Sequence, residues 1–331
     1  MGIIMRDCSL DLGKGLAILF VYLGHSILYH PISMPDIYPW CMTVERFIIS
    51  FNMPMFFLIS GYLFSNTRKG TMELYRGKTM RLLVPYLTTM AILIGVKVFL
   101  PASLSYNSAV SGGWISIILN ALCYGGDRWF VYVLYIIFLL LIPVRHYLMY
   151  KWIDFCLIML LIGVFFLDFL PGLFVLDKVF YYMVFFISGF MLNNYYQTIK
   201  VWALKRWHFI YVVFLVCNLF CIDVFCQITF VFRFVLPFIG TLAMMILAFQ
   251  MEKVREKNYV VKYIEYSGKY SLQFYLFTFC YPIIRWGIVS VLHVTNPVVI
   301  ILSVFVLQLV TITIIVEVTR RVKWLKIPCG Y

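Results

Sequence analysis

A lysine and a histidine lie in the first apolar stretch of the chain, and both residue types can take part in chemistry. Lys14 and His25 are eleven residues apart in "SLDLGKGLAILFVYLGHS". In a helix this spacing puts both side chains on one face, separated by roughly 16 Å along the axis. Asp11 precedes Lys14 by three residues, a spacing that allows an ion pair. An imidazole titrates near neutral pH, so His25 is a candidate general base.

The elements that hold these residues are expected to be transmembrane helices. Apolar residues make up 63% of the 331 residues and charged residues 12%, and the mean hydropathy is +0.94. Soluble domains are about half apolar and a quarter charged. We therefore expect an all-α, polytopic transmembrane helix bundle that forms a single domain over residues 1–331. The nine cysteines lack the paired spacing of a disulfide framework or a zinc site, and we expect no metal.

Inside a membrane, both ionisable residues also have a simpler interpretation. Lys14 could extend its ammonium group to the lipid headgroups, and His25 could hydrogen-bond a neighbouring helix. Ionisable groups in membrane spans are costly, and they are functional more often than not. Two of them on one helix face, with a carboxylate beside one, favour a functional site.

Ten stretches are long and apolar enough to be expected as membrane spans. They are approximately residues 12–29, 44–65, 82–101, 129–144, 152–169, 173–192, 208–226, 229–250, 270–292 and 297–318. The connection 102–128 contains "WISIILNALCY", which favours a helix that lies in the membrane interface or re-enters the membrane.

The positions of Lys and Arg predict the orientation of this bundle. If the N-terminus is cytoplasmic, the inner segments hold 20 of the 27 Lys and Arg residues, and the outer loops hold only Arg46, Arg128 and Lys178. Basic residues favour the cytoplasmic side. Both termini are therefore expected in the cytoplasm. Basic loops beside anionic lipid headgroups explain the net charge of +13 without nucleic acid as a partner.

The second expected span, "SFNMPMFFLISGYLF" at residues 50–64, is interrupted by polar and small residues. Pro54 is expected to free a backbone carbonyl inside the span. Ser60 and Gly61 are expected to let another helix approach closely. A kinked helix that serves only for packing explains the same residues.

A basic cytoplasmic turn follows in "YRGKTMRLLVPYL", residues 75–87. Arg76, Lys78 and Arg81 could bind an anionic cofactor from the cytoplasm. The general excess of basic residues on the inner side explains these three equally well.

With these motifs the chain resembles the integral-membrane acyltransferase-3 family. The family's first helix carries an Asp, a basic residue three positions later, ten intervening residues and a His, which Asp11, Lys14 and His25 match. Further matches are "MPMFFLISGYLF" at 53–64, the Lys-x-x-Arg-Leu-Leu-x-Pro-Tyr motif at 78–86, Trp129-Phe130, "FFISGF", and "YSGKYSLQFYLF" at 266–277. The resemblance covers about residues 7–280.

Two positions differ from the family pattern. Lys14 stands where Arg is more usual, so a bidentate grip on phosphate or carboxylate becomes a point charge. Thr278 stands where many members have a His after the Tyr-Leu block. No role of that second His is therefore carried over to this chain.

The resemblance implies a membrane O-acyltransferase, most often an O-acetyltransferase, in a bacterial cytoplasmic membrane. The donor would be cytoplasmic acyl-CoA, typically acetyl-CoA, and the acceptor a hydroxyl group of a cell-surface glycan or its precursor. His25 would be the base, and Lys14 would attract the donor's phosphates or pantetheine carbonyls. Ser60, Tyr62 or Trp129 are candidates to stabilise the developing oxyanion. No permanently bound cofactor is expected.

A multi-pass transporter of a small solute or glycan precursor is the main alternative. Ten helices, a broken second helix and charges at Arg233 and Arg285 also describe many carriers. A membrane scaffold without activity is a third possibility, and it predicts that His25 can be replaced freely. Acyl transfer from a labelled donor, as opposed to transport of an unmodified solute, separates these classes.

Overall fold

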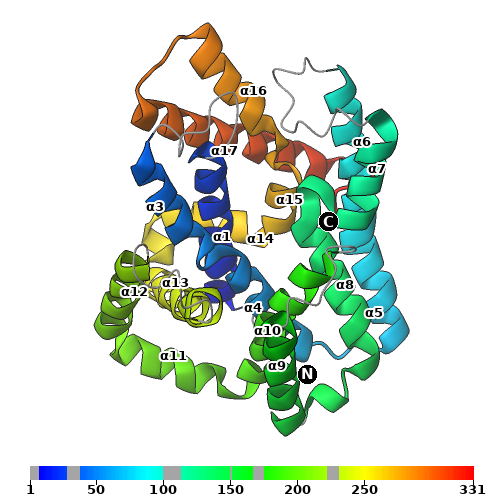
Figure 1. Ribbon diagram of the computed structural model, residues 1–331, viewed down its shortest axis with the longest axis vertical. Helices are drawn as coiled ribbons and strands as arrows, with labels where there is room; N and C mark the ends of the chain where they lie inside the picture. The colour runs from blue at the N-terminus through cyan, green and yellow to red at the C-terminus, as the bar shows by residue number, and fades with distance from the viewer. Residues whose placement is uncertain (1–6, 28–37, 100–112, 150, 167–174, 222–230) are drawn as a thin grey trace.

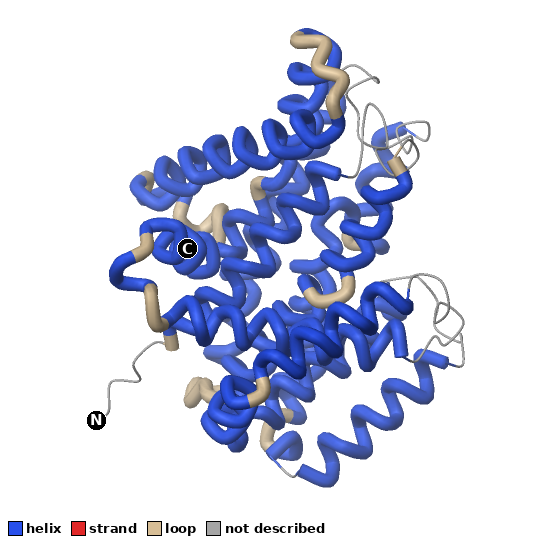
Figure 2. Tube along the Cα trace, turned by 90° about the vertical axis from the view of Figure 1, so that its left-hand side faces the viewer, coloured by secondary structure: helices blue, strands red, loops and turns tan. Residues whose placement is uncertain are grey.

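The computed structural model describes residues 7–27, 38–99, 113–149, 151–166, 175–221 and 231–331. Every regular element in these ranges is a helix, and they contain no strand (Figures 1 and 2). The expected all-α class is therefore confirmed. One continuous apolar cluster forms most of the core. Its main contributors are α1 (Cys8–Ile27), α4 (Asn52–Ser65), α8 (Trp129–Val144), α10 (Leu176–Leu192) and α13 (Leu236–Glu252).

Five of the expected spans are confirmed as helical segments long and apolar enough to cross a membrane. They are Cys8–Ile27, Pro39–Ser65, Ala121–Val144, Arg233–Glu252 and Pro297–Arg321. Four other expected spans contain helices of 15 to 17 residues within the described part of the chain. They are α6 (Val84–Phe99), α9 (Lys151–Phe166), α10 and α12 (Trp207–Cys221). The described residues thus define a multi-pass membrane protein, and the number of ten spans stays a prediction.

The expected span 270–292 is broken into short pieces. They are α15 (Ser271–Leu276), η10 (Thr278–Cys280), α16 (Tyr281–Trp286) and η11 (Gly287–Val291). Pro282 lies in the first turn of α16, and its missing N–H prevents a regular helix from continuing through this point. The break brings α15 and α16 against the C-terminal half of α1.

The first helix, α1, lies in the centre of the bundle (Figure 1). In its most apolar 18-residue window 72% of the residues are buried, against 28% for the C-terminal helix α17 (Pro297–Arg321). The helices that pack against α1 are α3 (Pro39–Ile49), α4, α13, α14 (Tyr259–Lys269), α15, α16 and α17. A polar residue on α1 is therefore placed inside the protein rather than against lipid.

The helices α4 and α10 approach each other closely at two glycines. A Cβ atom on Gly61 would lie 1.8 Å from the carbonyl oxygen of Phe186, and one on Gly189 would lie 1.9 Å from that of Leu58. Only a residue without a side chain fits such backbone contact. The close approach expected at Gly61 is confirmed, and its partner is the glycine of "FFISGF".

The interruption expected in the second span is confirmed, and the carbonyl freed by Pro54 stays a prediction. The second span consists of two helices, because α3 ends at Ile49 and α4 begins at Asn52 after a turn. Pro54 therefore lies in the first turn of α4, where the backbone N–H has no partner within the helix in any case. The irregular point of this span precedes the proline.

The connection between the third and fourth expected spans ends in a helix, as "WISIILNALCY" indicated. The helix α7 (Gly113–Tyr124) is followed by the 3-10 turn η3 (Gly126–Arg128). Residues 100–112 lie outside the described residues.

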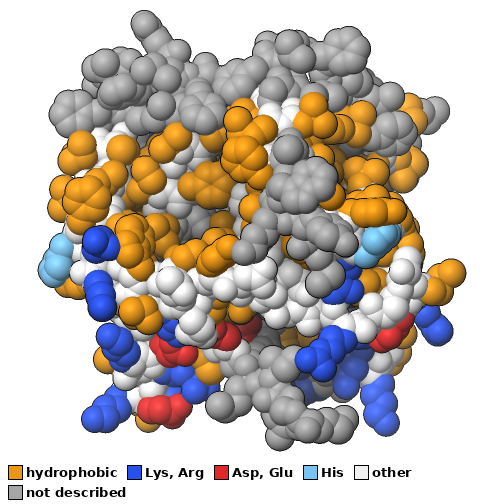
Figure 3. All heavy atoms as spheres, turned by 90° about the horizontal axis from the view of Figure 1, so that it is seen from below, with side chains coloured by type: hydrophobic (Ala, Val, Ile, Leu, Met, Phe, Trp, Pro, Cys, Tyr) orange, Lys and Arg blue, Asp and Glu red, His pale blue; other side chains and the backbone are white. Residues whose placement is uncertain are grey.

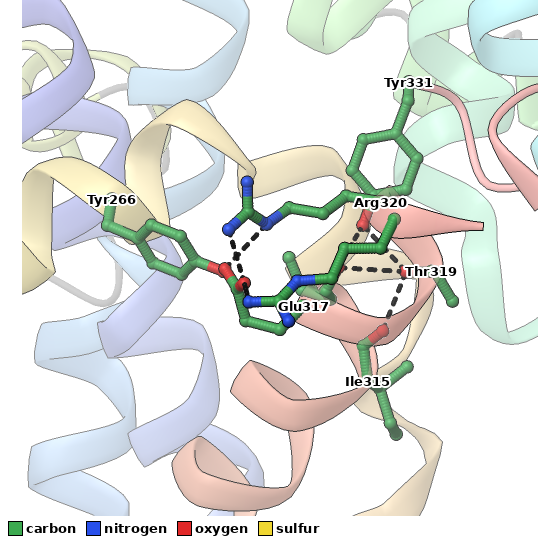
Figure 4. A network of polar contacts seen from close by, with 8 residues as sticks. Tyr266, Ile315, Glu317, Thr319, Arg320 and Tyr331 are labelled. Carbon is green, nitrogen blue, oxygen red and sulfur yellow. Dashed lines mark hydrogen bonds and ion pairs between the residues drawn. The ribbon is translucent and has the colours of Figure 1, made fainter. Parts of the chain in front are cut away.

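Polar contacts join α14 to the end of α17 (Figure 4). The hydroxyl of Tyr266 donates to the Glu317 carboxylate at 2.7 Å, and Arg320 donates to the same oxygen at 2.8 Å. The hydroxyls of Thr319 and Tyr331 are 2.8 Å apart. The Tyr266–Glu317 contact holds α14 to α17, and α14 also packs along the N-terminal half of α1.

The surface follows the charge asymmetry of the sequence. In Figure 3, Lys and Arg side chains gather in the lower half of the view, below a broad band of hydrophobic side chains. Helix α17 exposes an apolar stripe with a spacing of four residues, formed by Leu302, Val306, Val310, Ile314 and Val318. Such a stripe fits contact with lipid, and the charged region fits headgroups and water.

Candidate active site

Lys14 and His25 lie near opposite ends of the single helix α1. The Lys14 ammonium forms an ion pair with the Asp11 carboxylate, with 2.7 Å between Nζ and Oδ1. The side chains are 18% and 6% exposed, so the pair lies largely inside the bundle. The ion pair predicted from the spacing is therefore confirmed.

The His25 ring is held by an aromatic neighbour and has an unpartnered nitrogen. It stacks on Tyr281 of α16, with the ring centroids 5.0 Å apart and the planes at 16°. The Nδ1 atom is buried and has no hydrogen-bond partner within the described part of the chain. A buried polar atom without a hydrogen bond is unfavourable. The unpaired Nδ1 of His25 is therefore a candidate for contact with a ligand.

A buried arginine belongs to the same cluster. Arg128 is 4% exposed, and Arg128 and Asp127 are the charged groups that act electrostatically on His25. Its Nη1 donates to the Thr278 hydroxyl at 3.0 Å. Its guanidinium carbon lies 5.9 Å from the centroid of the Tyr275 ring. Nε and Nη2 are buried without a hydrogen-bond partner among the described residues.

The sequence alone predicts Arg128 in an outer loop, where it would only contribute to topology, and its burial corrects that interpretation. The signal that was missed is "GGDRWF". Gly125 and Gly126 have φ angles of 72° and 48°, in the left-handed region that favours glycine. This turn lets the chain reverse from α7 into α8 and directs Arg128 into the bundle.

Of the three candidate oxyanion donors, Trp129 lies beside this cluster. It follows Arg128 directly, and its ring stacks on Tyr182 with the centroids 5.4 Å apart. The next backbone N–H, of Phe130, donates to the Tyr275 hydroxyl at 3.3 Å. The Trp129 ring is therefore held by α10, while the backbone of the next residue is anchored to α15.

Tyr62 and Ser60 lie elsewhere on α4. The Tyr62 ring is 4.8 Å from that of Tyr196, and both line an apolar cavity of about 390 Å³ together with Leu10. Leu10 belongs to the first turn of α1, so Tyr62 lies at the end opposite His25. Ser60 precedes Gly61, where α4 meets α10.

The predicted basic donor residues lie on α5 (Thr71–Lys78) and the π-helical turn η1 (Thr79–Leu83). Arg76 and Arg81 are exposed, whereas Lys78 places its ammonium 3.6 Å from the centroid of the Phe138 ring. Burial, helped by the charges of Arg81 and Lys69, lowers the pKa of Lys78 to about 7. Single π-helical turns occur frequently at functional sites.

A second basic feature was not singled out from the sequence. A cavity of about 420 Å³ is lined by Arg68, Lys69, Arg145 and His146, among others. Arg145 donates to the backbone carbonyls of Ser65 and Thr67 and so fixes the turn after α4. Arg76, Lys78 and Arg81 do not line this cavity. The sequence did contain a signal for this cavity, because its basic residues belong to two of the segments rich in Lys and Arg, 66–81 and 145–151.

Comparisons with known proteins agree with the motifs. A family profile described as "Acyltransferase domain" (Acyl_transf_3) matches residues 8–317. Nodulation protein NolL of Mesorhizobium japonicum is 37% identical over 84 residues, which cover 25% of this chain and 22% of that protein. Nodulation protein NolL of Sinorhizobium fredii is 30% identical over 137 residues, 41% of this chain and 36% of that protein. No solved structure matches.

The chain thus combines helical segments long and apolar enough to cross a membrane with a match to an acyltransferase domain. The profile covers nearly the entire chain, and the chain belongs to the acyltransferase-3 family.

Proposed function

We propose that the protein transfers an acyl group, most simply acetyl, from cytoplasmic acyl-CoA to a hydroxyl group of a cell-surface glycan or its lipid-linked precursor. Family membership supports the reaction class. The observation that carries the site is the buried Nδ1 of His25 on the central helix, which has no hydrogen-bond partner among the described residues. A base in this setting is available to a substrate hydroxyl group rather than committed to the protein.

The reaction requires one group that accepts and returns a proton, and His25 takes that part. The acceptor hydroxyl oxygen attacks the thioester carbonyl carbon while its proton moves to the imidazole. The tetrahedral intermediate then collapses, the carbon–sulfur bond breaks, and the proton passes from His25 to the coenzyme A thiolate. Each turnover thus returns His25 to its neutral form.

The cations of the inner half support binding of a polyanionic donor. Lys14 lies about three turns of helix from His25, and Asp11 holds its ammonium in place. Arg76, Lys78 and Arg81 supply charge for the phosphates at the cytoplasmic side. The donor would then enter from inside, with its thioester reaching toward His25.

The test uses the full chain reconstituted in vesicles with labelled acetyl-CoA and glycan acceptors from host membranes. We expect label in the acceptor and release of coenzyme A, both reduced by a factor of about 10² to 10⁴ in His25→Ala. His293→Ala is the matched control, because this histidine is exposed. Movement of an unmodified solute without cleavage of acetyl-CoA would replace the enzyme by the transporter alternative.

We also propose that both termini are cytoplasmic and that the membrane is the cytoplasmic membrane of a bacterium, as relatives from two rhizobia support. His293 and Lys257 are exposed residues expected on the outer and the inner side. In intact cells a membrane-impermeant thiol reagent should label His293→Cys and not Lys257→Cys, with the unsubstituted chain as background. The reverse pattern would invert the topology.

A further inference from the structure

We infer that the acceptor is an acidic sugar, and that Arg128 binds its carboxylate or phosphate group through Nε and Nη2. This inference rests on the proposed function, because it names the class of acceptor used at the same site. It follows from the burial of Arg128, the state of its donor groups and its neighbours.

Arg128 is a buried cation without a paired carboxylate among the described residues. It is 4% exposed, and none of the ion pairs between described residues includes it. Its hydrogen bond to Asp127, at 3.4 Å, goes to the backbone carbonyl rather than the side chain. An uncompensated charge inside a membrane protein is strongly unfavourable and marks a site for a charged partner.

The free edge of the guanidinium has the geometry for a two-oxygen anion. Nη1 is held by Thr278 at 3.0 Å, which fixes the plane of the group. Nε and Nη2 share one edge of that plane, and both are buried without a partner in the described part of the chain. Two parallel N–H donors on one edge match the two oxygens of a carboxylate or a phosphate.

The surroundings suit a sugar ring that carries such an anion. Tyr275 lies beside the guanidinium, Tyr281 stacks on His25, and Trp129 follows Arg128 in the chain. Aromatic walls with a few placed polar groups are typical of small-molecule sites. Arg128 contacts Thr278 and His25 contacts Tyr281, three residues further along, so a sugar bound by its charge lies in the same cluster as the base.

The oxyanion of the tetrahedral intermediate is the competing partner for the same donors. It exists only briefly, so it would leave Arg128 uncompensated in the ground state, whereas a substrate anion pairs with it on binding. The two assignments differ when water replaces the sugar, because hydrolysis of acetyl-CoA passes through the same oxyanion without any sugar charge.

The binding experiment uses the full chain in lipid nanodiscs with labelled D-glucuronate, glucose 1-phosphate and glucose. We expect one of the two anionic sugars to bind about tenfold or more tightly than glucose, and the preferred one identifies carboxylate or phosphate. Arg128→Gln should abolish this preference, and Arg128→Lys should retain part of it. Arg46→Gln, which removes another charge expected on the outer side, should leave it unchanged. Equal binding of the three sugars by the unsubstituted protein overturns the inference, and so does an unchanged preference in Arg128→Gln.

The kinetic experiment measures acetyl-CoA hydrolysis without sugar. We expect Arg128→Gln to lower transfer to the acidic sugar at least about tenfold more than it lowers this hydrolysis, since no acceptor anion takes part in the hydrolysis. An equal loss in the two reactions would reassign Arg128 to the oxyanion and refute acceptor binding. If the unsubstituted protein never cleaves acetyl-CoA, the proposed function fails, whereas the sugar preference is still decided by the binding experiment.

Discussion

The backbone of Asp11 on α1 lies directly against Gly268 on α14. A Cβ atom on Gly268 would come within 1.7 Å of the Asp11 carbonyl oxygen, and one on Gly15 would come within 1.9 Å of the Ile264 carbonyl oxygen. The turn of α1 that carries Lys14 is therefore packed backbone to backbone against α14. Any side chain at these glycines must push the two helices apart.

Gly268→Ala should destabilise the protein by about 1–3 kcal/mol, the usual cost of overpacking a well-packed contact. The measurement is thermal unfolding of the purified protein in detergent. Gly95→Ala on α6 is the matched control, because no atom lies within 4 Å of the added Cβ and alanine favours the helix. Equal stability of the two variants would show that the helices separate there without cost.

The basic turn after α4 should contribute to donor affinity. Replacing Arg76, Lys78 and Arg81 together by Gln should raise KM for acetyl-CoA more than it lowers kcat, because charge attracts the donor before the chemical step. Steady-state kinetics of correctly inserted protein measure both constants.

The control for this triple variant removes the same charge from another inner segment. Arg321, Lys323 and Lys326 are exposed at and after the end of α17, and replacing them by Gln should leave KM unchanged. If both triple variants have the same KM as the unsubstituted protein, then Arg76, Lys78 and Arg81 only set topology.

Donor binding should weaken as the pH rises through neutrality. Because the pKa of Lys78 lies at about 7, its side chain is positively charged below pH 7 and loses this charge above pH 7. The donor diphosphate stays ionised, so KM for acetyl-CoA should rise about two- to fivefold between pH 6 and pH 8. Lys78→Arg keeps its charge at both pH values and should remove this dependence. A rise of equal size in Lys78→Arg would assign it to another group.

Some parts of this site follow from local sequence, and others do not. The spacing of Asp11 and Lys14 predicts their ion pair because one helix carries both residues, and Gly61 predicts close packing because any side chain would block it. Arg128 could not be recognised in this way. Its partner Thr278 is 150 residues away, and the contact depends on how the break after α15 packs against the turn before α8. The division of residues 270–292 into short helices could not be predicted either, since this segment is as apolar as a continuous span.

Lys14 and His25 should affect different steps of one reaction. Lys14→Arg should be tolerated, because the charge and the pairing with Asp11 remain. Lys14→Met keeps a similar apolar stem but removes the cation that would attract the donor. It also leaves the Asp11 carboxylate, which is 6% exposed, without this partner. We therefore expect Lys14→Met to raise KM for acetyl-CoA strongly, which donor titrations at matched expression would measure.

His25→Gln separates a base from a residue that only packs. Gln keeps hydrogen-bonding capacity but cannot accept and return a proton near neutral pH, so acyl transfer should fall by a factor of about 10² to 10⁴ while KM for the donor stays nearly constant. Thermal unfolding of the same variant should show a folded protein, since the His25 Nδ1 has no partner to lose within the described residues. Near-normal transfer by His25→Gln would exclude the general-base role, and a raised KM for the donor with an unchanged kcat would assign His25 to donor binding instead.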